Sequence, residues 1–163
     1  MASRRKGRIL AFQALYFWEA SRAFNADTQD DGQPGVPVRE LVKFSWVEEE
    51  KLKKYDEGII VFSKMLVTGA IENINEIDSM IRRHLENWDI QRLNRVDLAI
   101  LRMSAYTLIF QSDIPPGIAI DEAIGICREF GADDSFKFIN GVLDSIRREL
   151  HSKAKEETCA ART

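Results

Sequence analysis

Four cationic side chains stand close together near the start of this 163-residue chain and could bind phosphate groups. They are Arg4, Arg5, Lys6 and Arg8. Residues 1–24 hold five basic residues against the single acidic Glu19, a local charge of +4, although the whole chain carries −3. Such a cluster can bind a polyanion at one place although the protein as a whole is acidic. The alternative is a solvated, mobile terminus that binds nothing.

Residues that catalyse reactions or hold metal ions are scarce in the sequence. The only histidines are His84 and His151, and the only cysteines, Cys127 and Cys159, lie far apart with no CxxC spacing. This usage is typical of a reducing cytosol and disfavours a zinc site or a disulfide scaffold. The signatures GxGxxG, GxxxxGK[ST], HExxH and GxSxG do not occur in the sequence. The sequence therefore predicts a binding protein and not an enzyme, with no cofactor and no metal ion.

The sequence contains no run in which apolar and polar residues alternate, the pattern typical of a β-strand. We therefore expect a helix to position the basic cluster. Apolar residues at helical spacing predict helices over residues 3–24, 38–46, 47–69, 74–87, 94–111, 121–130 and 134–150, with Ser3 as the first N-cap. The polar residues 25–37 predict an exposed acidic loop, and residues 151–163 predict a flexible tail. The pattern indicates an all-α bundle in which residues 1–150 form a single domain.

The first helix also imitates a secretion signal, because its basic residues precede an apolar run over residues 9–18. Gln13 interrupts that run, and Ile9, Phe12 and Tyr16 recur on one helical face. No segment approaches the ~20 apolar residues that span a bilayer. We therefore expect a cytoplasmic amphipathic helix and no membrane partner.

The helix predicted over residues 94–111 is apolar on nearly every side, which is typical of a helix in the middle of a bundle. Arg102 lies inside it and must be paired, since an isolated buried charge costs several kcal/mol. We expect its partner to be Glu122. We also expect Gly141 to allow a close approach between helices.

Three blocks of sequence, in order and suitably spaced, resemble one known family. The first is residues 4–8 (RRKGR) with QALY at residues 13–16 and Trp18. The second runs from Asn87-Trp88 through residues 96–106 (VDLAILRMSAY). The third runs from residues 113–115 (DIP) through residues 119–123 (AIDEA) to residues 134–144 (DSFKFINGVLD). Together they resemble the NusB family of bacterial transcription antitermination factors over most of residues 3–150.

The resemblance implies a fold, an activity and a set of partners. The expected fold is a NusB-like bundle of about seven helices in two packed subdomains. The expected activity is binding of boxA-type single-stranded RNA as a heterodimer with NusE, a small-subunit ribosomal protein. With NusA, NusG and RNA polymerase, this pair helps transcription pass terminators, notably in ribosomal RNA operons. The resemblance also leaves open a homodimer that hides the RNA surface.

The resemblance also implies roles for particular residues. It assigns Arg4, Arg5, Lys6, Arg8, Tyr16, Lys137 and Phe138 to RNA binding, and Asp97 and Asp134 to partner binding. Tyr16 and Phe138 could stack on bases, or could equally belong to the core. Asp97 could be a surface acid near a helix N-terminus, and Asp134 could act as an N-cap.

Two other functions stay open from the sequence. One is a helical protein-interaction module that binds no RNA, with the basic run as a disordered tail. The other is a stand-alone NusB-like domain from the lineage of an RNA cytosine methyltransferase.

Overall fold

The computed structural model describes residues 2–27 and 35–162, and all regular structure in these ranges is helical. The described helices are α1 (Ala2–Asp27), α2 (Val38–Leu41), α3 (Glu49–Leu52), α4 (Glu57–Glu72), α5 (Ile74–Arg83), the 3-10 turn η1 (Ile90–Arg92), α6 (Arg95–Phe110), α7 (Pro116–Phe130) and α8 (Ser135–Ala160). The all-α prediction is confirmed. Within these ranges no helix is long and apolar enough to cross a membrane.

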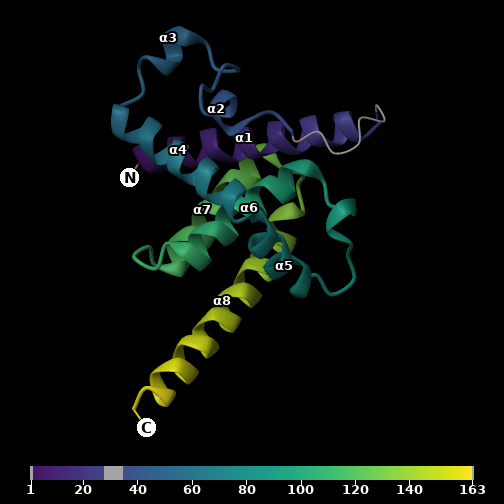
Figure 1. Ribbon diagram of the computed structural model, residues 1–163, viewed down its shortest axis with the longest axis vertical. Helices are drawn as coiled ribbons and strands as arrows, with labels where there is room; N and C mark the ends of the chain where they lie inside the picture. Colours follow the sequence, from purple (N-terminus) through teal and green to yellow (C-terminus); the bar gives the residue numbers. More distant parts are fainter. Residues whose placement is uncertain (1, 28–34, 163) are drawn as a thin grey trace.

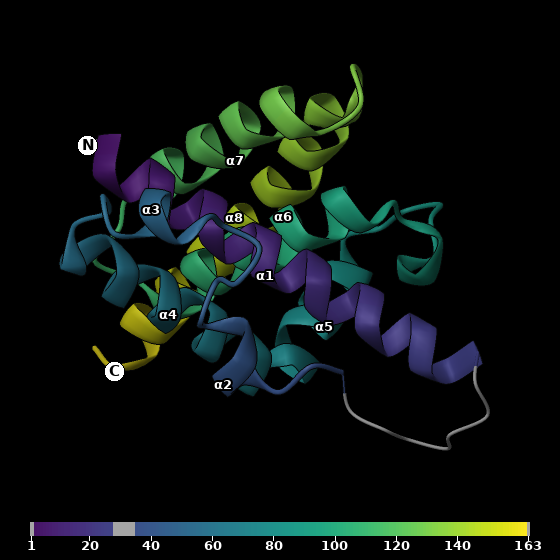
Figure 2. The same ribbon diagram turned by 90° about the horizontal axis from the view of Figure 1, so that it is seen from above.

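Helix α6 lies in the middle of the bundle, as its apolar sequence predicts. It packs against α1 and α4 as well as against α5, α7 and α8 (Figures 1 and 2). The side chain of Asn94 caps its first turn by accepting hydrogen bonds from the backbone N–H groups of Val96 (2.8 Å) and Asp97 (3.1 Å). One buried apolar cluster joins all the long helices. The side chains at the two ends of α6 are therefore held in fixed places.

Helix boundaries differ from the predicted ones at both ends of the chain. Helix α1 begins at Ala2, so Ser3 is not its N-cap, and it continues to Asp27. The predicted acidic loop therefore starts later, and its residues 28–34 lie outside the described residues. Helix α8 continues to Ala160, so the end predicted near Leu150 is wrong by ten residues. Its last turns stand clear of the bundle, with every side chain of residues 151–160 exposed (Figure 1).

The helices predicted over residues 38–46 and 47–69 are broken into shorter pieces. Helices α2 and α3 have four residues each, and only α4 is long. Helix α2 already ends at Leu41, and Phe44 turns the chain after it, since its φ of 51° lies in the left-handed region and its ring is buried. Asp56 starts α4 by accepting a hydrogen bond from the backbone N–H of Gly58 at 3.0 Å.

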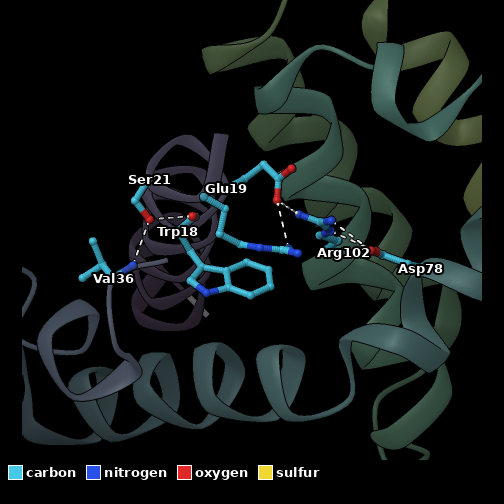
Figure 3. A network of polar contacts seen from close by, with 7 residues as sticks. Trp18, Glu19, Ser21, Val36, Asp78 and Arg102 are labelled. Carbon is cyan, nitrogen blue, oxygen red and sulfur yellow. Dashed lines mark hydrogen bonds and ion pairs between the residues drawn. The ribbon is translucent and has the colours of Figure 1, made fainter. Parts of the chain in front are cut away.

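Arg102 is buried in α6 and forms ion pairs with two carboxylates (Figure 3). It donates two hydrogen bonds of 2.9 Å to Asp78 of α5 and one of 2.8 Å to Glu19 of α1. Burial disfavours the charged guanidinium, but these carboxylates outweigh that cost and raise the pKa of Arg102. The predicted partner, Glu122, is wrong, because Glu122 lies on α7 and faces Arg5 of α1 at 3.9 Å instead.

Candidate nucleic-acid interface

The four N-terminal cations lie on the first turns of α1, where the structure divides them into two kinds. Arg4 and Lys6 are exposed, and each lies over an aromatic ring. The guanidinium carbon of Arg4 is 5.6 Å from the centre of the Phe62 ring, and the Lys6 ammonium is 5.9 Å from that of Tyr55. These cations are free of carboxylate partners within ion-pair distance among the described residues, so their charge is available to a ligand.

Arg5 and Arg8 are engaged by the protein itself. Arg5 of α1 pairs with Glu129 of α7 at 2.8 Å, and it lies 3.9 Å from Glu122 on the same helix. Arg8 is buried, with its guanidinium carbon 5.4 Å from the centre of the Phe62 ring. Burial lowers the pKa of Arg8, and the nearby Glu122 charge opposes that shift. Both residues therefore help to hold α1 in place.

The close approach of α1 to α4 depends on Gly7. A Cβ on Gly7 would lie 2.7 Å from Cδ1 of Phe62, which is too close for two carbon atoms. The hydroxyl of Ser63 donates a hydrogen bond of 3.0 Å to the backbone oxygen of Gly7. The close contact between α1 and α4 brings the Phe62 ring next to the guanidinium groups of Arg4 and Arg8. It therefore fixes the position of the first turns of α1 on the protein.

The junction of α7 and α8 carries a second group of cations around one ring. The guanidinium carbon of Arg128 lies 4.6 Å from the centre of the half-buried Phe136 ring, and the Lys137 ammonium lies 5.9 Å from it. Glu129, the partner of Arg5, is next to Arg128 in α7. The Arg5–Glu129 ion pair therefore joins the basic end of α1 to the last turns of α7, where Arg128 also lies. Sequence reasoning missed Arg128 and Phe136, and the adjacent aromatic and cation at residues 136–137 were the available signal.

An open groove of about 470 Å³ lies between the start of α6, the start of α8 and the segment between α5 and α6. Its lining includes Phe138, Trp88 and Leu93, together with the carboxylates of Asp97, Asp133 and Asp134 and the single cation Arg92. The structure thus brings three of the predicted site residues, Asp97, Asp134 and Phe138, to one place. Its floor is apolar and three of its four charged groups are acidic.

Asp97 is a buried carboxylate, not the surface acid considered as its alternative. Its side chain is 7% exposed, and Oδ2 accepts a hydrogen bond of 3.0 Å from the Ser135 hydroxyl. Its Oδ1 is buried and has no hydrogen-bond partner among the described residues. Burial raises the pKa of Asp97, although the Ser135 hydrogen bond acts in the opposite direction. The groove therefore contains a carboxylate whose hydrogen-bonding capacity is not used within the described part of the chain.

We expect Asp97→Asn to make the protein more stable near neutral pH. The helix dipole favours an anion at this first-turn position by about 0.3–1 kcal/mol, but burial costs more, as the raised pKa shows. The expected gain is on the order of 1 kcal/mol. Since the folded state holds the Asp97 proton more tightly than the unfolded state, wild-type stability recovers as pH falls through the folded pKa. Urea unfolding at several pH values measures this difference.

The gain should shrink as the pH falls, because wild-type Asp97 then becomes neutral too. Asp133→Asn is the matched control, since Asp133 lines the same groove but is exposed. A gain of equal size for both variants, or one that does not depend on pH, would contradict this account of Asp97.

The remaining predicted residues occupy intermediate positions. Tyr16 is half-buried, packs against the core and has its ring edge-on to Phe17 with centroids 5.7 Å apart. Phe138 is also half-buried and packs against the core, but one side of it faces the groove. Asp134 occupies the N-cap position of α8 without a side-chain capping hydrogen bond, so capping does not explain it.

Metal chemistry finds no support in the side chains. Among residues 2–27 and 35–162, no cluster of three histidine, cysteine or acidic residues could hold a metal ion. The arrangement of basic and aromatic side chains suits phosphates and bases instead.

Comparison with known proteins gives one consistent family. The family model described as "NusB family" matches residues 5–148. A transcription antitermination protein NusB from Treponema denticola is 50% identical over 146 residues, covering 90% of this chain and 96% of the relative. The solved structure of NusB from T. maritima has a TM-score of 0.71 at 35% identity, covering 90% of this chain and 91% of that one.

A second solved structure shows such a protein with partners. It is described as the antitermination factors NusB and NusE in complex with double-stranded RNA. Its matching chain has a TM-score of 0.72 at 31% identity, and the match covers 91% of this chain and 98% of that one.

Proposed function

The chain belongs to the NusB family, and from this premise we propose that it is a transcription antitermination factor that binds boxA-type RNA as a heterodimer with NusE. Residues 1–150 act as the RNA-binding domain, working in the cytoplasm where the transcript is made. The observation that carries the proposal is the pair of contrasting surfaces. One is basic and aromatic and runs from α1 to the start of α8, and the other is the acidic, apolar groove beside it.

The basic surface suits single-stranded RNA. Arg4 and Lys6 supply free charges, and Lys137 supplies another at the far end. Arg5 and Arg8 keep α1 in position, and Arg8 adds to the positive potential of this surface, whereas the charge of Arg5 is offset by Glu129. The half-buried rings of Tyr16 and Phe138 offer their accessible parts to unpaired bases. In this interface the cations bind the phosphates of the RNA backbone, and a few aromatic rings stack on its bases.

The acidic groove suits a protein partner. Asp134 is exposed at its rim, while Asp97 lies on its wall. A partner segment with apolar side chains and a basic or hydrogen-bond-donating group would bury the floor and satisfy these carboxylates. RNA phosphates would be repelled from the same carboxylates. We therefore assign the groove to NusE, and a relative that has been solved in complex with NusE and RNA supports NusE as the partner.

The proposed pair joins NusA, NusG and RNA polymerase in a larger assembly that reads through terminators in ribosomal RNA operons. The family match disfavours a methyltransferase lineage, since the match covers 96% of the T. denticola relative, which is named as an antitermination protein. Self-association that covers the basic surface would act as a competing state.

Read-through in a reconstituted transcription reaction tests the proposal. The template carries a boxA leader upstream of a terminator, and the control template carries a scrambled boxA. Adding this protein with NusE, NusA and NusG should raise the read-through fraction only on the boxA template. Equal read-through on both templates, or none, would contradict the antitermination role.

A further inference from the structure

We propose that Trp88 is the stacking platform for one unpaired base of the bound RNA, and that the base enters from the Lys137 side of the Trp88–Phe138 ring pair. This inference rests on the proposed function, because it names which part of the RNA meets which residue. Trp88 is in the segment between α5 and α6, and it is 61% exposed. An indole this exposed has much of its ring surface accessible to a ligand.

The exposed ring is backed by a second ring. The Trp88 and Phe138 centroids lie 6.2 Å apart at an interplanar angle of 60°, so Phe138 braces the indole from the start of α8. Both rings line the acidic groove and also a second pocket of about 320 Å³ on their other side. The ring pair therefore forms the wall between two hollows.

The two hollows differ in charge and in hydrogen-bonding groups. The groove has Asp97, Asp133 and Asp134 against Arg92. The second pocket has Lys137, Asn87 and Ser145 on its lining, with Glu86 as its only carboxylate among the described residues. It can offer an ammonium to a phosphate and an amide to a base edge. Charge complementarity thus places the base, with its phosphate, in the second pocket, and leaves the groove to the protein partner.

Hydrogen bonds hold the side chain of His84, which lines the second pocket. The His84 ring is fixed by two contacts, Nδ1 to the Ser145 hydroxyl at 2.6 Å and Nε2 to Glu149 at 2.5 Å. Gly141 of α8 lines the same pocket, and a Cβ placed on it would meet no atom within 4 Å. The expectation that Gly141 permits close helix packing is therefore wrong. Its missing side chain leaves the pocket open.

This geometry gives a clean set of variants. Trp88→Leu removes the aromatic face, and Trp88→Phe keeps a smaller one. Gly141→Leu places an apolar side chain in the pocket, at a position where the added Cβ meets no atom within 4 Å. We expect Trp88→Leu and Gly141→Leu to weaken binding of a boxA-type single strand by about 5- to 100-fold, the usual value of one base stack, and Trp88→Phe to restore most of it.

Fluorescence anisotropy with labelled RNA and the NusE-bound protein measures these affinities. A set of RNAs with one abasic nucleotide each identifies the stacked base. One abasic position should weaken wild-type binding by the same factor as Trp88→Leu and should not weaken Trp88→Leu further. Trp88 fluorescence should be quenched by RNA, with Trp18 buried and Trp46 half-buried as internal references.

Three outcomes separate this inference from the proposed function. RNA affinity unchanged by all three variants, with no quenching, would overturn the role of Trp88 while leaving RNA binding intact. Trp88→Leu that weakens NusE binding in the absence of RNA, with RNA affinity unchanged, would place the indole in the protein interface and overturn the inference. No RNA binding by the wild-type complex would overturn both.

Discussion

Replacing Arg102 by alanine is expected to lower the free energy of unfolding by about 3–5 kcal/mol. The cause is the carboxylates left behind: Asp78 is 8% exposed and loses both of its hydrogen bonds from Arg102, and Glu19 loses its shortest one. The indole of Trp18 also loses a cation stacked on it, since the Arg102 guanidinium carbon lies 5.5 Å from the ring centre. Chemical denaturation followed by circular dichroism measures the loss.

A paired replacement separates the charge effect from the packing effect. Arg102→Met combined with Asp78→Leu removes both buried charges and keeps apolar volume, so it should recover most of the stability lost in Arg102→Ala. Arg22→Ala is the control, because Arg22 also lies over Trp18 but is exposed, and its loss should cost less than about 1 kcal/mol. A loss of that small size for Arg102→Ala would show that the network does not hold α1, α5 and α6 together.

The second large effect is expected on RNA binding. Arg4→Ala combined with Lys6→Ala should weaken binding and reduce the slope of log affinity against log salt by about 1.4, because each single-strand phosphate contact contributes about 0.7. Both side chains are exposed and their ring contacts are weak, so the melting temperature should change little. Anisotropy titrations at several salt concentrations give the slope.

Arg8→Ala should behave differently from that pair. Because Arg8 is buried against Phe62, its replacement should lower the free energy of unfolding by about 1–3 kcal/mol. The slope of log affinity against log salt should change less than it does for the Arg4 and Lys6 pair. Lys155→Ala with Arg162→Ala removes the same charge from the exposed end of α8 and the turn that follows it, and should leave both the slope and the stability unchanged. Equal loss of slope for the two double variants would mean that RNA binding follows net charge and not the basic end of α1.

The sequence predicts the fold class well because helical periodicity is local. The apolar repeat of α6 places that helix in the middle of the bundle, as observed. The helix ends were harder to predict. Residues beyond Leu150 carry no apolar face, so their helical extension to Ala160 depends on backbone propensity and side-chain pairs along one helix.

The chemistry of the site was only partly predictable. Cation type and position identify the basic end, but only the fold shows that Glu129 neutralises Arg5 and that Arg8 is buried. The same holds for Arg102, whose partners Asp78 and Glu19 are 24 and 83 residues away in the chain. Trp88 belongs to a sequence block that resembles the family, yet nothing in its spacing shows an exposed ring braced by Phe138. Contacts between side chains that are far apart in the chain leave no recognisable pattern in the sequence, so they could not be predicted from it.

We propose that this chain binds a boxA-type single strand together with NusE. Fluorescence anisotropy of a boxA RNA and of a scrambled RNA tests this, with the chain alone and with NusE, at two salt concentrations. We predict tighter binding to boxA than to the scrambled strand, a difference that grows when NusE is present and survives the higher salt. Equal binding to both RNAs that disappears at the higher salt would contradict the claim and would favour a helical protein-interaction module.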